Sequence, residues 1–205
     1  MADDAAIPSD TVERLEKAED LKIACKHQEA LAILEELLSE DPENISALEE
    51  IADNELSLAR FDRAEAAARQ AVTLDAGSYT GHYILGFLRS RDERWANAIE
   101  HLRRANSLKS NNPEILRCLG WALFMQGERP QGIVTLERAL NLDADNVLIL
   151  CDLGMEYLQV RNVVKAKALF TRALEIEPTN HRARECLEAV TRFETLLQEG
   201  RAKVA

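Results

Sequence analysis

Small and apolar residues recur along the chain with a period of 34 residues, and this repetition organises the whole sequence. When each interval is counted from residue 11, position 8 is always small: Ala18, Ala52, Gly86, Gly120 and Gly154. Positions 20 and 27 are mostly small as well: Ala30, Ala64, Ala98, Gly132 and Ala166, then Leu37, Ala71, Ala105, Ala139 and Ala173. Larger apolar residues hold position 7 of the later intervals and most copies of position 24, at the spacing of amphipathic helices. Each interval therefore predicts two helices packed antiparallel through close backbone contacts.

Residues that cap helix N-termini recur in the same register and mark where each unit begins. A side-chain oxygen at such a position accepts a hydrogen bond from one of the first free amides of the helix. The predicted caps are Asp10, Asn44, Ser78, Asn112, Asn146 and Asn180. Proline two residues earlier, at Pro8, Pro42 and Pro178, ends the preceding segment. The pattern predicts five repeats over residues 11–178, with periodic bounds 11–44, 45–78, 79–112, 113–146 and 147–180.

The ends of the chain differ from the repeats. Residues 179–198 are amphipathic and predict one further helix, which would cover the apolar face that the last helix pair leaves exposed. Residues 1–10 and 199–205 are expected to be flexible. No linker separates the units, so the sequence predicts one elongated domain.

These positions resemble the tetratricopeptide repeat, which pairs Leu-Gly at positions 7 and 8 with Ala at 20, an aromatic residue at 24, Ala at 27 and Pro at 32. The fifth copy matches at Leu153, Gly154, Tyr157, Ala166, Phe170, Ala173 and Pro178, and the fourth at Leu119, Gly120, Gly127 and Ala139. The first copy departs, with Lys17 and Ala18 in place of Leu-Gly, and is expected to be the least stable. The resemblance implies an all-α, right-handed superhelical solenoid of antiparallel helix pairs, in which the first helix of each pair lines a concave groove.

Composition and charge narrow the class of partner. The chain has 205 residues, of which 46% are hydrophobic and 30% charged, and its net charge is -11. An acidic chain is a poor ligand for nucleic acid, whose phosphates need a basic surface. The charge is uneven: residues 1–77 hold 20 acidic and 7 basic residues, whereas residues 78–205 hold 16 and 18. No apolar run is long enough to span a membrane, and the four cysteines lie far apart, as in reduced cytoplasmic proteins. We therefore expect a cytoplasmic protein with no nucleic-acid or membrane partner.

The resemblance places positions 2, 5, 9, 12 and 13 of each first helix on the groove. In the early repeats these positions are acidic, and we expect Glu19, Glu49 and Asp53 to steer a basic segment, although charge on a helix face is often only solvated surface. In the later repeats they are apolar, with Cys151 among them. The candidate anchors are Tyr83, Phe87, Trp121, Phe124, Met125, Leu148, Met155 and Leu158. Tyr83 and Leu158 could equally pack between neighbouring first helices.

The sequence offers little for catalysis. The four histidines lack catalytic or metal-binding spacing, no glycine-rich phosphate loop occurs, and no cofactor or metal is expected. The groove positions also lack the Lys and Asn pattern with which some tetratricopeptide domains hold a carboxylate. We therefore expect an adaptor or scaffold that binds a helical or extended segment of another protein, with basic flanks, in the manner of an assembly chaperone or co-chaperone without a carboxylate clamp. The alternative is a structural subunit of a larger complex or a self-associating scaffold.

Overall fold

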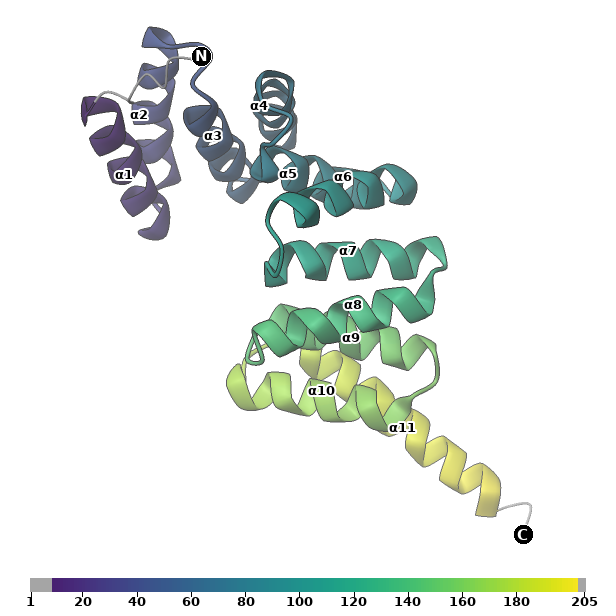
Figure 1. Cartoon of the computed structure of the whole chain (residues 1–205). Helices are drawn as coiled ribbons and strands as arrows, with labels where there is room; N and C mark the ends of the chain where they lie inside the picture. The colour runs from purple at the N-terminus through teal and green to yellow at the C-terminus, as the bar shows by residue number, and fades with distance from the viewer. Residues whose placement is uncertain (1–8, 203–205) are drawn as a thin grey trace. The chain divides into compact units, whose positions relative to one another are not determined.

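The computed structural model describes residues 9–202, which form eleven α-helices and no strand. The chain divides into two compact units, Met1–Lys109 and Ser110–Ala205. The first unit holds α1 (Ser9–Ile23), α2 (His27–Glu40), α3 (Ile45–Ser57), α4 (Phe61–Leu74), α5 (Tyr79–Arg91) and α6 (Trp95–Leu108) (Figure 1). The second holds α7 (Pro113–Gln126), α8 (Arg129–Leu142), α9 (Val147–Gln159), α10 (Val163–Ile176) and α11 (His181–Ala202). The all-α prediction is confirmed.

Helix starts follow the predicted caps at five of the six positions. The side chains of Asn44, Ser78 and Asn180 accept hydrogen bonds from the amide three residues later, at 2.9 to 3.0 Å. Asn112 and Asn146 each accept from two amides. The prediction for Asp10 is wrong, because α1 begins at Ser9 and Asp10 lies in its first turn. A carboxylate there still interacts favourably with the N-terminal end of the helix dipole.

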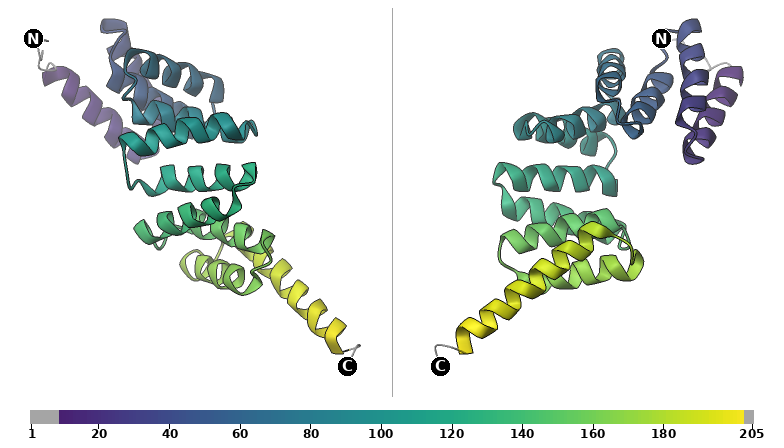
Figure 2. Two further views of the ribbon diagram at one scale, coloured as in Figure 1. Left: turned by 45° about the vertical axis from the view of Figure 1, so that its right-hand side comes forward. Right: turned by 180° about the vertical axis from the view of Figure 1, so that it is seen from behind.

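The two ends of the chain depart from the predicted bounds. Helix α11 runs to Ala202, so residues 199–202 are helical where a flexible tail was predicted. Residues 1–8 and 203–205 of the predicted flexible ends lie outside the described residues. Helix α11 packs against α9 and α10 and covers the last helix pair (Figure 2).

Close contact between the two helices of a pair depends on the small residue at position 8. A β-carbon placed on Gly86 would come within 2.6 Å of the Leu102 side chain, and one on Gly154 within 2.7 Å of the Phe170 ring. On Gly120 it would meet the Leu136 side chain at 2.8 Å and the carbonyl oxygen of Gly132 at 3.0 Å. Real β-carbons are not found so close to other atoms, so these glycines let the residue at position 24 pack directly on the backbone of the first helix.

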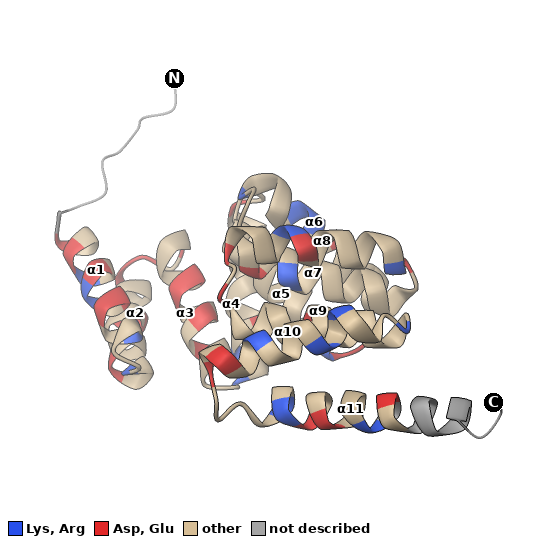
Figure 3. Cartoon of the chain, turned by 90° about the horizontal axis from the view of Figure 1, so that it is seen from below, with Lys and Arg blue, Asp and Glu red and all other residues tan. Residues whose placement is uncertain are grey.

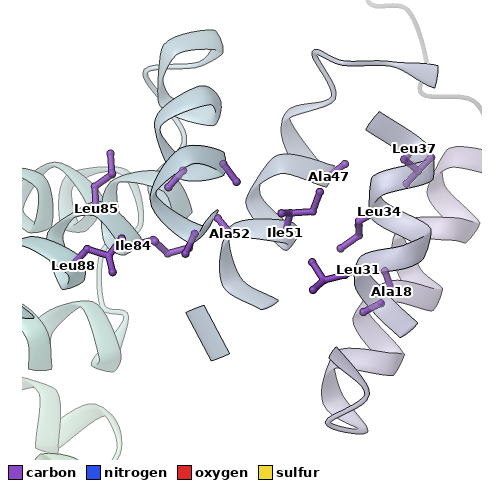
Figure 4. Close-up of a cluster of buried hydrophobic side chains, with 14 residues drawn as sticks. Ala18, Leu31, Leu34, Leu37, Ala47, Ile51, Ala52, Ile84, Leu85 and Leu88 are labelled. Atoms are coloured by element: carbon purple, nitrogen blue, oxygen red, sulfur yellow. The ribbon is translucent and has the colours of Figure 1, made fainter. Parts of the chain in front are cut away.

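Each unit buries its own apolar core between consecutive pairs. In the first unit Leu31 and Leu34 of α2 pack with Ile51 of α3, and the cluster continues to Ile84 and Leu88 of α5 (Figure 4). In the second unit the core joins residues of α7, α8, α9, α10 and α11: Leu116, Leu136, Leu153, Phe170 and Val190.

Long polar side chains at position 26 of the second helices tie neighbouring repeats together. Gln70 Nε2 donates to the carbonyl of Pro42 at 3.0 Å, and an Arg104 nitrogen donates to the carbonyl of Ala76 at 3.1 Å. In the second unit, Arg138 donates to Asn111 and Arg172 to Asp145. Each bond joins a second helix to the turn that precedes its own repeat.

The turn inside each pair uses a residue with left-handed backbone geometry, again at a 34-residue interval. These residues are Cys25, Ala59, Glu93, Gly127 and Arg161, with φ between 55° and 106°. The next amide closes the helix end by donating to the carbonyl five residues earlier, as Arg60 does to Glu55 at 2.8 Å. Only Gly127 has the residue type that this geometry favours.

Glycine at the strained turn positions should therefore stabilise the protein. We expect Ala59→Gly to raise the free energy of unfolding by about 0.5–1 kcal/mol, because relief of the left-handed strain exceeds the added entropy of the unfolded chain. The matched control is Ala66→Gly, an exposed position inside α4, where glycine should cost about 1 kcal/mol. Urea unfolding of the three proteins measures both effects. Equal losses at the two positions would show that the turn is not strained.

A carboxyl group lies in the core of the second unit. Glu156 of α9 is fully buried and its oxygens have no hydrogen-bond partner among the described residues. Burial, with a smaller contribution from Asp152, raises the pKa of Glu156 to about 9. The group is therefore neutral at pH 7 in the folded chain, whereas in the unfolded chain it ionises above the ordinary glutamate pKa of 4.5.

This difference predicts an unusual pH dependence of stability. Below pH 4.5 the protonated carboxyl is present in both states, and between about pH 4.5 and 9 ionisation favours the unfolded chain, so the contribution of Glu156 to stability is lost as pH rises. Glu156→Gln should leave stability near pH 4.5 almost unchanged and raise it by up to about 3 kcal/mol at pH 7. Denaturant unfolding across this range tests it, with the exposed Glu188→Gln as control. Parallel profiles for wild type and Glu156→Gln would contradict the assignment.

Candidate partner-binding surfaces

The first helices of the pairs form one face within each unit, which we call the first-helix face. In the first unit it is built by α1, α3 and α5, and α3 packs against both of the others. In the second unit α7 packs on α9, and α9 packs on α11. The sequence-predicted binding residues lie on these helices, and the two units are described in turn.

The acidic residues of the first unit are less uniform than the sequence suggests. Figure 3 shows Asp and Glu along α1 and α3, and Glu19 is exposed on α1. Asp53 instead forms an ion pair with Lys22 Nζ at 3.1 Å, and the same ammonium group lies 2.7 Å from Glu50. Charge on α3 is therefore partly neutralised from α1.

Glu49, one of the predicted acidic residues, also forms a hydrogen bond between two helices. Its carboxylate accepts a hydrogen bond of 2.5 Å from the hydroxyl of Ser78, the residue that caps α5. Burial raises the pKa of Glu49 above its usual range, and the bond from Ser78 opposes this change. Glu49 thus links α3 to the start of α5.

The aromatic residues Tyr83 and Phe87 of α5 are half-buried. Both pack against the apolar core of the first unit. The structure therefore gives each of them a packing role, and each residue remains partly accessible. Whether they anchor a partner stays a prediction.

In the second unit a chain of charged residues crosses the first-helix face. Arg117 of α7 donates to Glu114 at 2.5 Å and to Asp152 of α9 at 2.7 Å. The other oxygen of Asp152 lies 2.9 Å from a guanidinium nitrogen of Arg182 in α11. Asp152 is buried, and each of its two oxygens is paired with an arginine. These ion pairs connect α9 to α7 and to α11. Sequence analysis missed this cluster, although its members occupy positions 2, 5 and 6 of first helices.

Exposed apolar residues lie on the two helices that carry Arg117 and Asp152. Met125 of α7 is 40% exposed and Leu148 of α9 is 52% exposed. Trp121 is half-buried, and Met155 and Leu158 are half-buried against the core of the second unit. Helical spacing places Trp121 and Leu148 one turn from the cluster residues Arg117 and Asp152, respectively.

The prediction that Phe124 is an accessible anchor is wrong. Phe124 is only 2% exposed, and its amide and β-carbon lie against Gly132 of α8, at 2.9 and 2.8 Å from where a β-carbon of Gly132 would be. The residue at position 12 therefore packs inside the α7–α8 pair. Cys151, which belongs to the same row of the sequence, is also buried.

The buried cysteines are not reactive. Burial raises the pKa of the Cys118 thiol to about 12 and that of Cys151 to about 11. Both thiols are therefore protonated at neutral pH, and the thiolate is the form that attacks substrates or binds metals. Within residues 9–202, the structure places no three His, Cys, Asp or Glu side chains where they could hold a metal ion.

A pocket that sequence analysis did not predict lies between α8, α9 and α10, with a volume of about 450 Å³. Its lining includes the apolar side chains of Leu140, Leu153 and Leu169. At its edge the hydroxyl of Tyr157 donates to Glu137 and accepts from Lys165 Nζ at 2.7 Å. This chain of bonds joins α8 to α10.

Among the described residues, no helix is long and apolar enough to cross a membrane.

Comparisons with known proteins agree with this architecture. Residues 148–180 match the family model for the tetratricopeptide repeat. A segment of 125 residues, 58% of the chain, is 28% identical to mouse (Mus musculus) protein O-mannosyl-transferase TMTC1, and the match covers 13% of that protein's length.

Several solved structures share the fold at low sequence identity. TTC0263, a tetratricopeptide-repeat protein of Thermus thermophilus, is 22% identical with a TM-score of 0.68, over 87% of this chain and 97% of that one. YrrB, described as having an unusual peptide-binding site, is 19% identical with a TM-score of 0.63, over 85% and 90%. A chain of the Cut9–Hcn1 complex is 19% identical with a TM-score of 0.79, over 89% and 36%. Residues 148–180 therefore match the tetratricopeptide repeat, and the described residues share the fold of solved tetratricopeptide-repeat structures.

Proposed function

We propose that this chain is a protein-interaction scaffold whose first-helix face in the second unit binds an apolar segment of a partner protein. The fold supports the general role, because tetratricopeptide-repeat proteins bind other proteins or peptides. YrrB is described as having a peptide-binding site, and Cut9 was solved in complex with Hcn1. Neither description names a partner for the present chain.

The observation that carries the proposal is the mixed surface around Asp152. Leu148 and Met125 are exposed although the core of the unit does not need them, and the charges between the helices are already matched by one another. A partner could make apolar contacts on such a surface without covering a charge that lacks a partner. Met and aromatic residues are also common at interface centres. A segment with apolar side chains would displace water from it.

The acidic first unit favours a partner that also carries basic residues. Glu19 is exposed, and residues 1–77 carry a large excess of acidic groups. Charges at an open surface mainly affect association rate and salt dependence. Holding an apolar segment away from water is also the task of an assembly chaperone or co-chaperone, and we include that role in the proposal. Its four cysteines form no disulfide bond, which suits the cytoplasm.

Selection from a random peptide library displayed on phage, followed by anisotropy measurements with the best peptides, tests the proposal. We expect Leu148→Asp to weaken binding at least tenfold, because it places a charge where an apolar contact is made. The matched control is Val164→Asp, which changes a more exposed valine, 76% accessible, on the second helix α10. It should change affinity less than twofold.

Two results would contradict the proposal. If the two substitutions weaken peptide binding equally, the second-helix side is as important as the first-helix face. If no peptide is selected and the chain sediments as an oligomer that Leu148→Asp dissociates, the exposed apolar residues serve self-association. The structural-subunit alternative would then be the correct function.

A further inference from the structure

Two histidines of the first unit face each other across a helix pair. Nδ1 of His82 in α5 lies 3.0 Å from Nδ1 of His101 in α6. The ring centroids are 5.3 Å apart with 40° between the ring planes. With these separations the two nitrogens point at each other, as in a hydrogen bond between the rings. Both rings are half-buried.

The chemistry of imidazole sets how many protons this contact tolerates. A neutral ring carries one N–H, so one histidine donates from Nδ1 and the other accepts there. A first added proton can go to Nε2 of the donor ring, and the bond survives. A second proton must go to the acceptor Nδ1, and two N–H groups would then oppose each other at 3.0 Å. The contact is therefore compatible with at most one added proton.

The surroundings of the pair oppose extra positive charge. Arg69 of α4 and Arg89 of α5 act on His101, and Arg104 of α6 acts on His82. Glu100 of α6 favours the protonated form of both rings. Two other carboxylates on helices that pack against α5 already have partners. Glu65 of α4 is bonded to Arg69 and Arg89, and Glu49 of α3 is bonded to Ser78.

Burial is the largest cause that lowers the pKa of each histidine. For His82 the charge of His101 and of Arg104 lowers the pKa further, and the carbonyl of Ala76 opposes this change. For His101 the main opposing group is Glu100. The unfolded chain therefore takes up protons near pH 6.5 that the folded pair takes up only at lower pH.

We propose that the His82–His101 contact is an acid-sensitive clamp that holds α5 to α6 at neutral pH and opens when both rings are protonated. The clamp acts on a helix that carries Tyr83 and Phe87, the residue after His82 and the one five positions after it. Opening would loosen these two rings on the first-helix face of the first unit. This last consequence rests on the proposed function, whereas the clamp itself does not.

Long-range ¹H–¹⁵N spectra of the full chain test the contact directly. At pH 7.5 we expect one of the two histidines with its proton on Nδ1 and the other with its proton on Nε2. On acidification both should titrate below the ordinary histidine pKa of about 6.5. Two independent titrations near pH 6.5, or two rings of the same tautomer, would overturn the proposal.

Denaturant unfolding provides the second measurement. Between pH 7 and 5.5 the unfolding constant of the wild type should rise roughly tenfold more than that of His82→Gln/His101→Gln, because the unfolded chain binds at least one proton that the folded pair excludes. His181→Gln, which removes an exposed histidine outside the pair, is the control for loss of an imidazole. If the double variant does not fold, His101→Gln alone should reduce the pH dependence in the same direction. An unchanged pH dependence in a folded variant would overturn the clamp.

Discussion

The close approach of two helices at position 8 is the contact on which the rest of the structure depends. Because Gly154 has no side chain, the Phe170 ring packs on the backbone of α9, and the same arrangement recurs at Gly86 with Leu102 and at Gly120 with Leu136. In α3 and α4 the two positions are both alanine, Ala52 and Ala68, and both are fully buried. Position 8 thus holds a small residue in each of these pairs, and within each unit consecutive pairs bury apolar side chains against one another.

Polar contacts connect helices to the turns and helices around them, in addition to the close contact inside each pair. Arg104 and Arg172 reach back from second helices to the preceding turns, and Arg117, Asp152 and Arg182 connect three first helices. Removing one partner of a buried charge leaves the other unmatched, which costs more than the pair contributes to stability. The charged cluster therefore specifies the arrangement of α7, α9 and α11, while Leu148, one turn from Asp152, stays exposed.

Repetition made most of the fold predictable. Caps such as Asn44 and Asn146 and small residues such as Gly120 are local signals of helix starts and close helix contacts. Because each signal recurs every 34 residues, the copies support one another. The left-handed turn at Ala59, Glu93 and Arg161 carries no such signal, because the repeat geometry imposes it on residues that do not favour it. The sequence also does not show which of the family's groove positions are buried. Phe124 and Leu148 both occupy such positions, but Phe124 is buried against Gly132 and Leu148 is exposed. The buried Glu156 breaks the apolar pattern, and its position alone gave no indication of its neutral state.

A double-mutant cycle on Gly154 and Phe170 tests most directly whether close packing at position 8 determines the fold. Gly154→Ala should destabilise the wild type by about 1–3 kcal/mol despite the better helix propensity of alanine, because its β-carbon would meet the Phe170 ring. In the Phe170→Ala background, which reproduces the Ala52 and Ala68 combination, the same change should be neutral or stabilising, giving a coupling energy of at least about 1 kcal/mol. Free energies of unfolding that add to within about 0.5 kcal/mol would contradict this account.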